Sequence, residues 1–145
     1  MLKDVAFPAK RELLPQMLNK INDEIKAHVD DDKLINRLKV CAEEILVNIV
    51  DYAYSDKTAD NKLFISCEYL EDKDALRFEF VDAGTPYNPL EQAPEVDLDA
   101  DIDERGIGGL GIFLYTTIMD KTEYFFKDGK NHLITLKYLT DRKGE

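Results

Sequence analysis

Two polar residues stand four positions apart in the otherwise apolar stretch CAEEILVNIVDYAY, and their types could bind a metal and accept a proton. On a helix, Glu44 and Asn48 would share one face. A carboxamide oxygen is a neutral ligand for Mg²⁺, and a carboxylate can act as a general base. Because such groups are costly to bury unless partnered, the pair indicates a site. The alternative is a boundary face with ordinary hydrogen bonding, and Asp51 beyond it is either a supporting or a solvated residue.

A second candidate lies in FVDAGTPYNP, where Asp82 ends an apolar strand pattern and Gly84 interrupts it. An aspartate before a glycine turn commonly forms an Asx-turn. The functional alternative is a carboxylate that accepts a hydrogen bond from the amino group of a ligand. Gly84 would then leave room for a flat ring against the backbone.

The segment 106–111, GIGGLG, contains four glycines and fits the dinucleotide-binding pattern G-x-G-x-x-G through Gly106, Gly108 and Gly111. That pattern requires an apolar strand directly before it, whereas the acidic stretch DLDADIDER stands there. A Walker phosphate loop fails too, since no Lys-Ser or Lys-Thr follows. The glycines still precede a helical pattern, where backbone N–H groups and the helix dipole can hold phosphate oxygens. The alternative is a flexible turn with tight helix packing.

Hydrophobic periodicity predicts the elements that must position these residues, in the order β-α-α-β-β-loop-α-β-β. The predicted elements are a strand at 5–8, helices at about 13–29 and about 31–54, strands at 62–70 and 75–83, a helix at about 110–119, and strands at 122–126 and 132–139 around the KDGK turn. Short turns between strands imply a mainly antiparallel mixed sheet covered on one face by helices, an α+β two-layer sandwich. The length predicts a single domain, 1–145.

Composition narrows the classes of partner. The formal net charge of -11 disfavours binding to nucleic acid or to an anionic membrane. No apolar run approaches the roughly 20 residues of a membrane span, and the N-terminus lacks a signal-peptide pattern, so we expect a cytoplasmic protein. Cys41 and Cys67 lack metal-ligand spacing and are predicted to be reduced, buried thiols. His28 and His132 are predicted to be surface or structural residues.

Together the three segments resemble the GHKL, or Bergerat-fold, ATPases, and the chain is similar to the small anti-sigma-factor serine/threonine kinases. Glu44-Ile-Leu-Val-Asn48 resembles the N box E-x-x-x-N, and Asp82-Ala-Gly84-Thr-Pro86 resembles the D-x-G-x-P box. Arg105-Gly-Ile-Gly-Gly-Leu-Gly111, followed by IFLYTTIMD, resembles the lid-and-glycine box. The order, the spacing and the closing hairpin agree over nearly the whole chain.

The resemblance implies a histidine-kinase-like ATPase fold, ATP and Mg²⁺ as cofactors, and a role for each matching residue. Asp82 would receive the adenine amino group beside Gly84, Asn48 would coordinate Mg²⁺, and Glu44 would be the catalytic base. Arg105 would reach the terminal phosphate. The segment at about 85–109 would be the ATP lid, and the phosphates would be wrapped by its end, namely Gly106, Gly108, Gly109, Leu110 and Gly111.

The resemblance also implies a regulatory switch. Such a kinase sequesters a sigma factor, phosphorylates a small antagonist protein on Ser or Thr, and forms a homodimer. Two alternatives are an ATP-binding interaction module without kinase activity and an interaction domain that binds no nucleotide.

The sequence departs from the family pattern in two places. The stretch 51–54, DYAY, stands where many relatives have His-Gly-Tyr, and Asn131-His132 stands where many have Gly-Thr. Neither change removes a phosphate or metal contact, but both bear on the details of the adenine pocket.

Overall fold

The computed structural model describes residues 1–92 and 107–140. Its elements in chain order are β1 Leu2–Pro8, η1 Arg11–Leu13, α1 Leu14–Lys26, α2 Asp32–Asn48, η2 Ile49–Ala53, β2 Lys62–Leu70, β3 Ala75–Asp82, η3 Pro89–Gln92, α4 Ile107–Ile118, β4 Lys121–Lys127 and β5 Lys130–Tyr138. The segment η2 is a π-helix that continues α2, whereas η1 and η3 are 3₁₀ helices. Each predicted strand and helix is present, with bounds that differ by a few residues.

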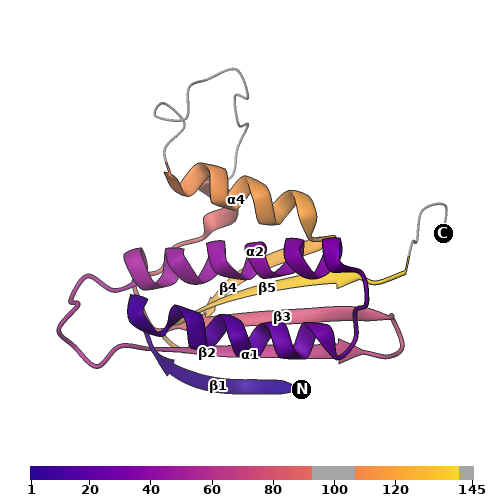
Figure 1. Cartoon of the computed structure of the whole chain (residues 1–145). Coiled ribbons are helices and arrows are strands. Elements are labelled where there is room, and N and C mark those ends of the chain that lie inside the picture. The colour runs from indigo at the N-terminus through magenta and orange to yellow at the C-terminus, as the bar shows by residue number, and fades with distance from the viewer. Residues whose placement is uncertain (93–106, 141–145) are drawn as a thin grey trace.

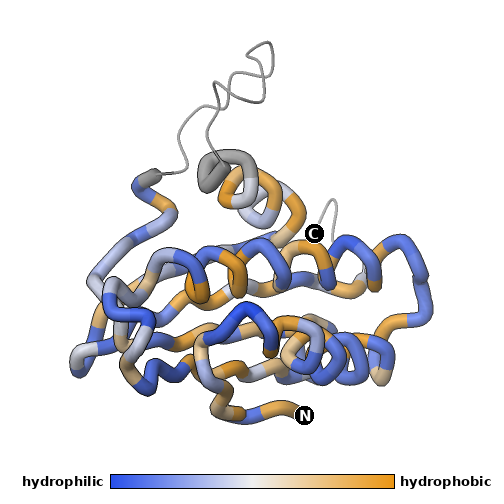
Figure 2. Tube along the Cα trace, turned by 60° about the vertical axis from the view of Figure 1, so that its left-hand side comes forward, coloured by the Kyte–Doolittle hydropathy of each residue, from blue (hydrophilic) through white to orange (hydrophobic). Residues whose placement is uncertain are grey.

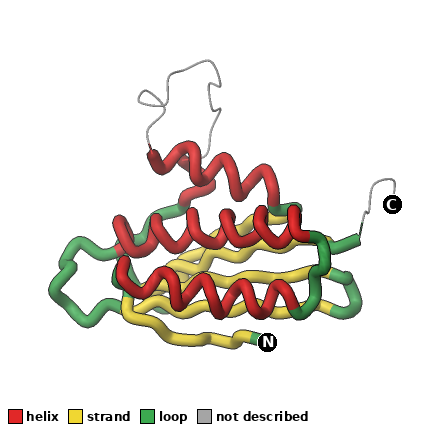
Figure 3. Tube along the Cα trace, viewed as in Figure 1, coloured by secondary structure: helices red, strands yellow, loops and turns green. Residues whose placement is uncertain are grey.

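The five strands form one sheet in the order β1-β2-β3-β5-β4, and every described strand pair is antiparallel. The helices lie on one face of this sheet, with α2 between α1 and α4 (Figures 1 and 3). The predicted two-layer α+β sandwich is therefore confirmed, although the described sheet is antiparallel throughout rather than mixed.

The first two helices form because their apolar residues recur at helical spacing and their first turns carry suitable residues. Pro15 lies in the first turn of α1, where its missing N–H removes no hydrogen bond. The side chain of Asp31 caps α2 by accepting a hydrogen bond from the N–H of Lys33 at 3.0 Å. Figure 2 shows hydrophobic and hydrophilic residues alternating around the turns of both helices. The apolar side chains buried by these helices are Met17, Leu18, Ile21, Ile25, Leu38, Cys41, Ala42, Ile45 and Leu46.

Two tight hairpins join neighbouring strands of the sheet. Asp128 and Gly129 join β4 to β5 with positive φ angles of 54° and 76°, as a type I′ turn requires. At the opposite end of the sheet, residues 71–74 join β2 to β3. The register then places Asp82 opposite Asn131, because β3 pairs with β5 over its full length.

The cysteines and histidines have structural surroundings, as predicted. Cys41 and Cys67 are free and buried, and burial raises the pKa of the Cys41 thiol to about 11 and that of Cys67 to about 12. His28 stacks on the ring of Tyr69 at 4.6 Å, and His132 stacks on Phe125 at 4.5 Å.

Candidate functional site

A cavity of about 510 Å³ lies between the end of α2, the end of β3 and the start of β5. Its walls are mostly apolar or aromatic and include the four tyrosines Tyr52, Tyr87, Tyr115 and Tyr124. Among the described residues that line it, three side chains carry a carboxylate or a carboxamide, namely Asn48, Asp82 and Asn131. A largely apolar cavity of this size with a few converging polar groups is typical of a small-molecule site.

Asp82 contributes a buried carboxyl group to this cavity, and its relative exposure is 5%. Its Oδ1 accepts hydrogen bonds from the N–H of Gly84 and from Nδ2 of Asn131, both at 2.9 Å. Burial raises the pKa of Asp82, and these two hydrogen bonds and the nearby His132 partly offset that rise. The Asx-turn interpretation of Asp82 is therefore confirmed. The residue also lines the cavity, and its hydrogen bond to a ligand amino group stays a prediction.

Close packing explains why residue 84 is glycine. A Cβ atom at this position would lie 2.1 Å from the carbonyl oxygen of Ala53. The same oxygen accepts a hydrogen bond from the N–H of Thr85 at 2.9 Å. The space that a side chain of residue 84 would need is thus filled by the end of η2. The predicted contact of Gly84 with a flat ligand ring stays a prediction.

Glu44 and Asn48 occupy successive turns of α2 and reach different parts of the site. Asn48 lines the cavity, whereas half-buried Glu44 lies against α4. A Cβ atom on Gly111 would be 2.5 Å from Oε2 of Glu44, so the missing side chain of Gly111 makes room for this carboxylate. The structure therefore brings the first and third motifs together near the start of α4.

The glycine motif is only partly described. Gly108, Gly109, Leu110 and Gly111 lie in the first turns of α4, which begins at Ile107, before the helix start that periodicity predicted. This helix start and η3 both fall within the predicted lid of about 85–109. Arg105 and Gly106 lie outside the described residues, so their roles remain predictions. A helix N-terminus favours anions, and glycines let a phosphate approach its backbone.

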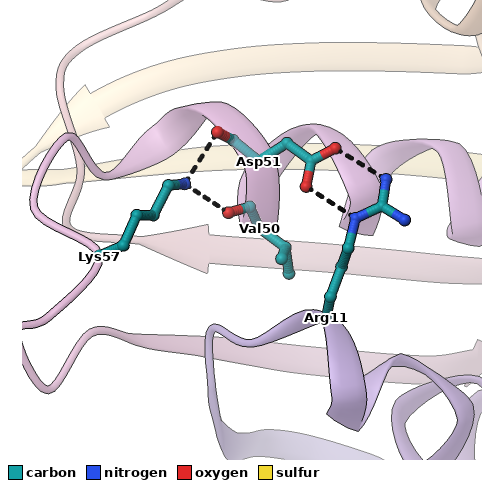
Figure 4. Close-up of polar contacts among 4 residues, drawn as sticks. All are labelled: Arg11, Val50, Asp51 and Lys57. Atoms are coloured by element: carbon teal, nitrogen blue, oxygen red, sulfur yellow. Dashed lines mark hydrogen bonds and ion pairs between the residues drawn. The ribbon is translucent and has the colours of Figure 1, made fainter.

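Asp51 belongs to the scaffold behind the site. Its carboxylate accepts hydrogen bonds from Nε and Nη2 of Arg11 at 3.1 and 3.0 Å, and this pairing lowers the pKa of Asp51 (Figure 4). Nζ of Lys57 donates to the carbonyl oxygens of Val50 and Asp51 at 2.7 and 2.8 Å. A cation at these last carbonyls stabilises the end of the helical segment.

Sequence reasoning missed two residues that hold Asp82 and its neighbours. Asn131, with a relative exposure of 6%, bridges Asp82 to the carbonyl oxygen of Thr85. The hydroxyl of Tyr54 accepts from the N–H of Ala83 at 2.8 Å and donates to the carbonyl oxygen of Lys62. The one available signal was that both residues fall in the two stretches that depart from the family pattern.

Comparison with known proteins identifies the class of protein that has this fold. Residues 7–137 match the model of the histidine kinase-like ATPase domain. The chain therefore belongs to the histidine kinase-like ATPase domain family.

Several curated relatives are serine-protein kinases. The chain is 30% identical over 114 residues to the serine-protein kinase RsbW of Listeria monocytogenes serovar 1/2a, covering 77% of this chain and 70% of the relative. It is 28% identical over 142 residues to RsbW of Staphylococcus aureus, covering 94% and 86%. The serine/threonine-protein kinase BtrW of Bordetella bronchiseptica is 31% identical over 96 residues, covering 66% and 65%. The sequence prediction of this kinase class agrees with these names.

Solved structures share the fold at low identity. A structure of the RsbU and RsbW domains of a Mycobacterium tuberculosis protein matches with a TM-score of 0.60 at 9% identity, covering 94% of this chain and 32% of that chain. A blue-light activated histidine kinase of Erythrobacter litoralis matches with a TM-score of 0.54 at 15% identity, covering 96% and 44%. The predicted fold is confirmed by these matches.

The packing of Gly84 predicts that a methyl group there is destabilising. Gly84→Ala should lower the free energy of unfolding by about 1–3 kcal/mol, because the new Cβ must displace backbone atoms of Ala53. Urea denaturation measures this change. The exposed neighbour provides the control, since Ala83→Ser should stay within about 0.5 kcal/mol of the unmodified chain. Unchanged stability of Gly84→Ala would contradict the close contact.

The buried carboxylate predicts a gain in stability when its charge is removed. Because burial raises the folded-state pKa of Asp82 above its ordinary value of 3.8, ionised Asp82 destabilises the folded chain at neutral pH. Asp82→Asn keeps an oxygen for the donors and should raise the free energy of unfolding at pH 7. The gain should shrink as the pH falls through the folded-state pKa, because both forms are then neutral.

The control for this measurement is Asp72→Asn, an exposed position in the hairpin at the other end of the sheet, which should leave stability unchanged. Lower stability of Asp82→Asn at pH 7 would show that the carboxylate stabilises the fold, contrary to this expectation.

Proposed function

We propose that this chain binds ATP with Mg²⁺ and transfers the terminal phosphate to Ser or Thr of a partner protein. The observation that carries the proposal is that three separated motifs meet at one place. Asn48 and Asp82 line the same cavity, and Glu44 packs against Gly111 beside it. The names of the curated relatives, serine-protein kinases, support the same activity.

The nucleotide base would lie at Asp82. Its buried carboxylate can accept a hydrogen bond from an exocyclic amino group, and the apolar walls of the cavity can cover a flat ring. An ionised acceptor in a buried site forms a stronger hydrogen bond than a neutral one. This favours a base with an exocyclic amino group, such as adenine, next to Asp82.

Magnesium would be held through Asn48. Among the described residues, no group of three carboxylate, histidine or cysteine side chains could hold a metal by itself. Mg²⁺ commonly uses one or two protein ligands together with phosphate oxygens and water, so a single carboxamide oxygen fits that pattern. When bound, the ion would neutralise charge on the phosphates.

Phosphate transfer would use Glu44 as the base. In the proposed step, the hydroxyl oxygen of Ser or Thr forms a bond to the terminal phosphorus while the bond to the bridging oxygen of ADP breaks. The hydroxyl proton passes to the carboxylate of Glu44. The N-terminal turns of α4 and, as the sequence predicts, Arg105 would hold the charged phosphates.

The regulatory setting is also a proposal. In analogy with the anti-sigma-factor kinases, the partner would be an antagonist protein and the sequestered regulator a sigma factor, with the chain acting as a cytoplasmic homodimer. The net charge of -11 favours a basic partner surface. None of the described helices is long and apolar enough to cross a membrane.

Nucleotide binding is tested by calorimetry with Mg-ATP. The unmodified chain should bind, and Asp82→Asn should weaken affinity by roughly 10- to 100-fold, the contribution of one hydrogen bond to a charged group. Asp72→Asn should bind like the unmodified chain. Absence of Mg-ATP binding by the unmodified chain would overturn the proposed function and favour an interaction domain without nucleotide.

Kinase activity is tested by phosphate transfer from γ-labelled ATP to a partner captured from the native extract. Glu44→Gln should bind Mg-ATP normally but transfer phosphate about 10²- to 10⁴-fold more slowly, because the base is lost. The exposed neighbour on α2 supplies the control, since Glu43→Gln should keep full activity. Full activity of Glu44→Gln would remove its role as the base. Mg-ATP binding without transfer by the unmodified chain would favour the binding module.

A further inference from the structure

Asn131 is the centre of the polar network in the cavity. Nδ2 donates to Oδ1 of Asp82 at 2.9 Å and to the carbonyl oxygens of Thr85 and Gly84 at 3.0 and 3.4 Å. Oδ1 of Asn131 accepts from the N–H of Tyr87 at 3.2 Å and from the hydroxyl of Tyr124. One side chain thus joins β3, β4, β5 and the segment that follows β3.

The carboxamide of Asn131 is fully used by these contacts. An asparagine side chain offers two N–H donors and one oxygen with two lone pairs. Its two hydrogens are shared among three protein acceptors, and its oxygen has two protein donors. Asn131 therefore acts on a ligand through its neighbours and not by direct contact.

The consequence for Asp82 is a fixed orientation. The donors from Asn131 and Gly84 both engage Oδ1, and neither uses Oδ2. A carboxylate held on one oxygen presents the other to a donor at a defined position. The same network holds Thr85 and Tyr87, which form part of the cavity wall.

We propose that Asn131 is a positioning residue that sets the selectivity of the cavity for a purine carrying an exocyclic amino group, by holding Asp82 so that its second carboxylate oxygen meets that group. This inference rests on the proposed function, because it assumes that the cavity binds a nucleotide. It adds a specificity determinant at a position where many family members have glycine and therefore no side chain.

The selectivity between two nucleotides distinguishes a positioning role of Asn131 from a packing role. If Asn131 only supported the fold, its loss would weaken the binding of every nucleotide to the same extent. If it orients Asp82, its loss weakens mainly the hydrogen bond to the amino group, because a carboxylate free to rotate no longer presents one oxygen at a fixed place. The useful quantity is the ratio of two affinities.

The experiment measures Kd by calorimetry on the full chain for Mg-ATP and for purine riboside triphosphate, which lacks the 6-amino group. The unmodified chain should prefer ATP by roughly 10- to 100-fold. In Asn131→Ala, this preference should fall about tenfold or more towards unity. Asn61→Ala is the matched control, because it removes a carboxamide that donates to the carbonyl oxygen of Asp56 in an exposed loop, and it should keep the full preference.

Two further variants keep the test decisive. In the Asp82→Asn background, adding Asn131→Ala should change the preference no further, because both residues act through one hydrogen bond. If Asn131→Ala does not fold, Tyr124→Phe removes a single donor to Asn131 and should lower the preference in the same direction.

The possible outcomes distinguish failure of the role inferred for Asn131 from failure of the proposed function. If the unmodified chain binds neither nucleotide, the proposed function fails. If it prefers ATP and Asn131→Ala keeps that preference, or if Tyr124→Phe keeps it where Asn131→Ala cannot be purified, only the role of Asn131 is overturned. Equal loss of affinity for both nucleotides in Asn131→Ala would also overturn it.

Discussion

The contact between the carbonyl of Ala53 and Gly84 is the constraint on which the site depends. It joins the end of the helix that carries Glu44 and Asn48 to the end of the strand that carries Asp82. A side chain at Gly84 would separate these two elements and open the cavity between them. Asn48 and the buried carboxylate of Asp82 therefore line one cavity because a glycine permits two backbone segments to touch.

The segment that supplies the carbonyl of Ala53 is wound differently from α2. The five residues of η2 follow the α-helix as a π-helix, a form that is often found at functional sites. Two cations hold this less regular segment, with Arg11 on the carboxylate of Asp51 and Lys57 on the last carbonyls (Figure 4). Arg11, Asp51 and Lys57 do not line the cavity. Their charged groups therefore stabilise η2 from outside the cavity.

The site combines a mostly apolar wall with one buried polar network. In such surroundings a hydrogen bond to a ligand is strong, and an unpaired polar group is costly. Asn131 donates a hydrogen bond to one oxygen of Asp82. The pKa of this carboxyl group is nevertheless raised, because burial disfavours its charged form. A buried carboxylate of this kind lowers stability, and residues that serve function commonly do so.

Local patterns in the sequence predicted the helices and strands, but they did not predict contacts between residues that are distant in the sequence. Apolar spacing predicted α1 and α2, and the Asp-Gly pair at 128–129 predicted the last hairpin. The same spacing did not predict the change from the α-helix α2 to the π-helix η2, because apolar residues continue through both. Asp82 and Asn131 are separated by 49 positions, and no local pattern distinguishes the second from an ordinary polar strand residue. The chemical roles of the candidate site residues, Arg105 and Gly106 included, stay predictions.

The two thiols have a practical consequence for chemistry on this protein. The chain contains two cysteines, both are buried, and the pKa values of about 11 and about 12 keep them protonated at neutral pH. Since thiolates are the reactive form, neither native cysteine competes well for an alkylating reagent. A single cysteine introduced at an exposed position such as Tyr87, on the cavity wall, could therefore carry a fluorescent reporter without removal of the native thiols.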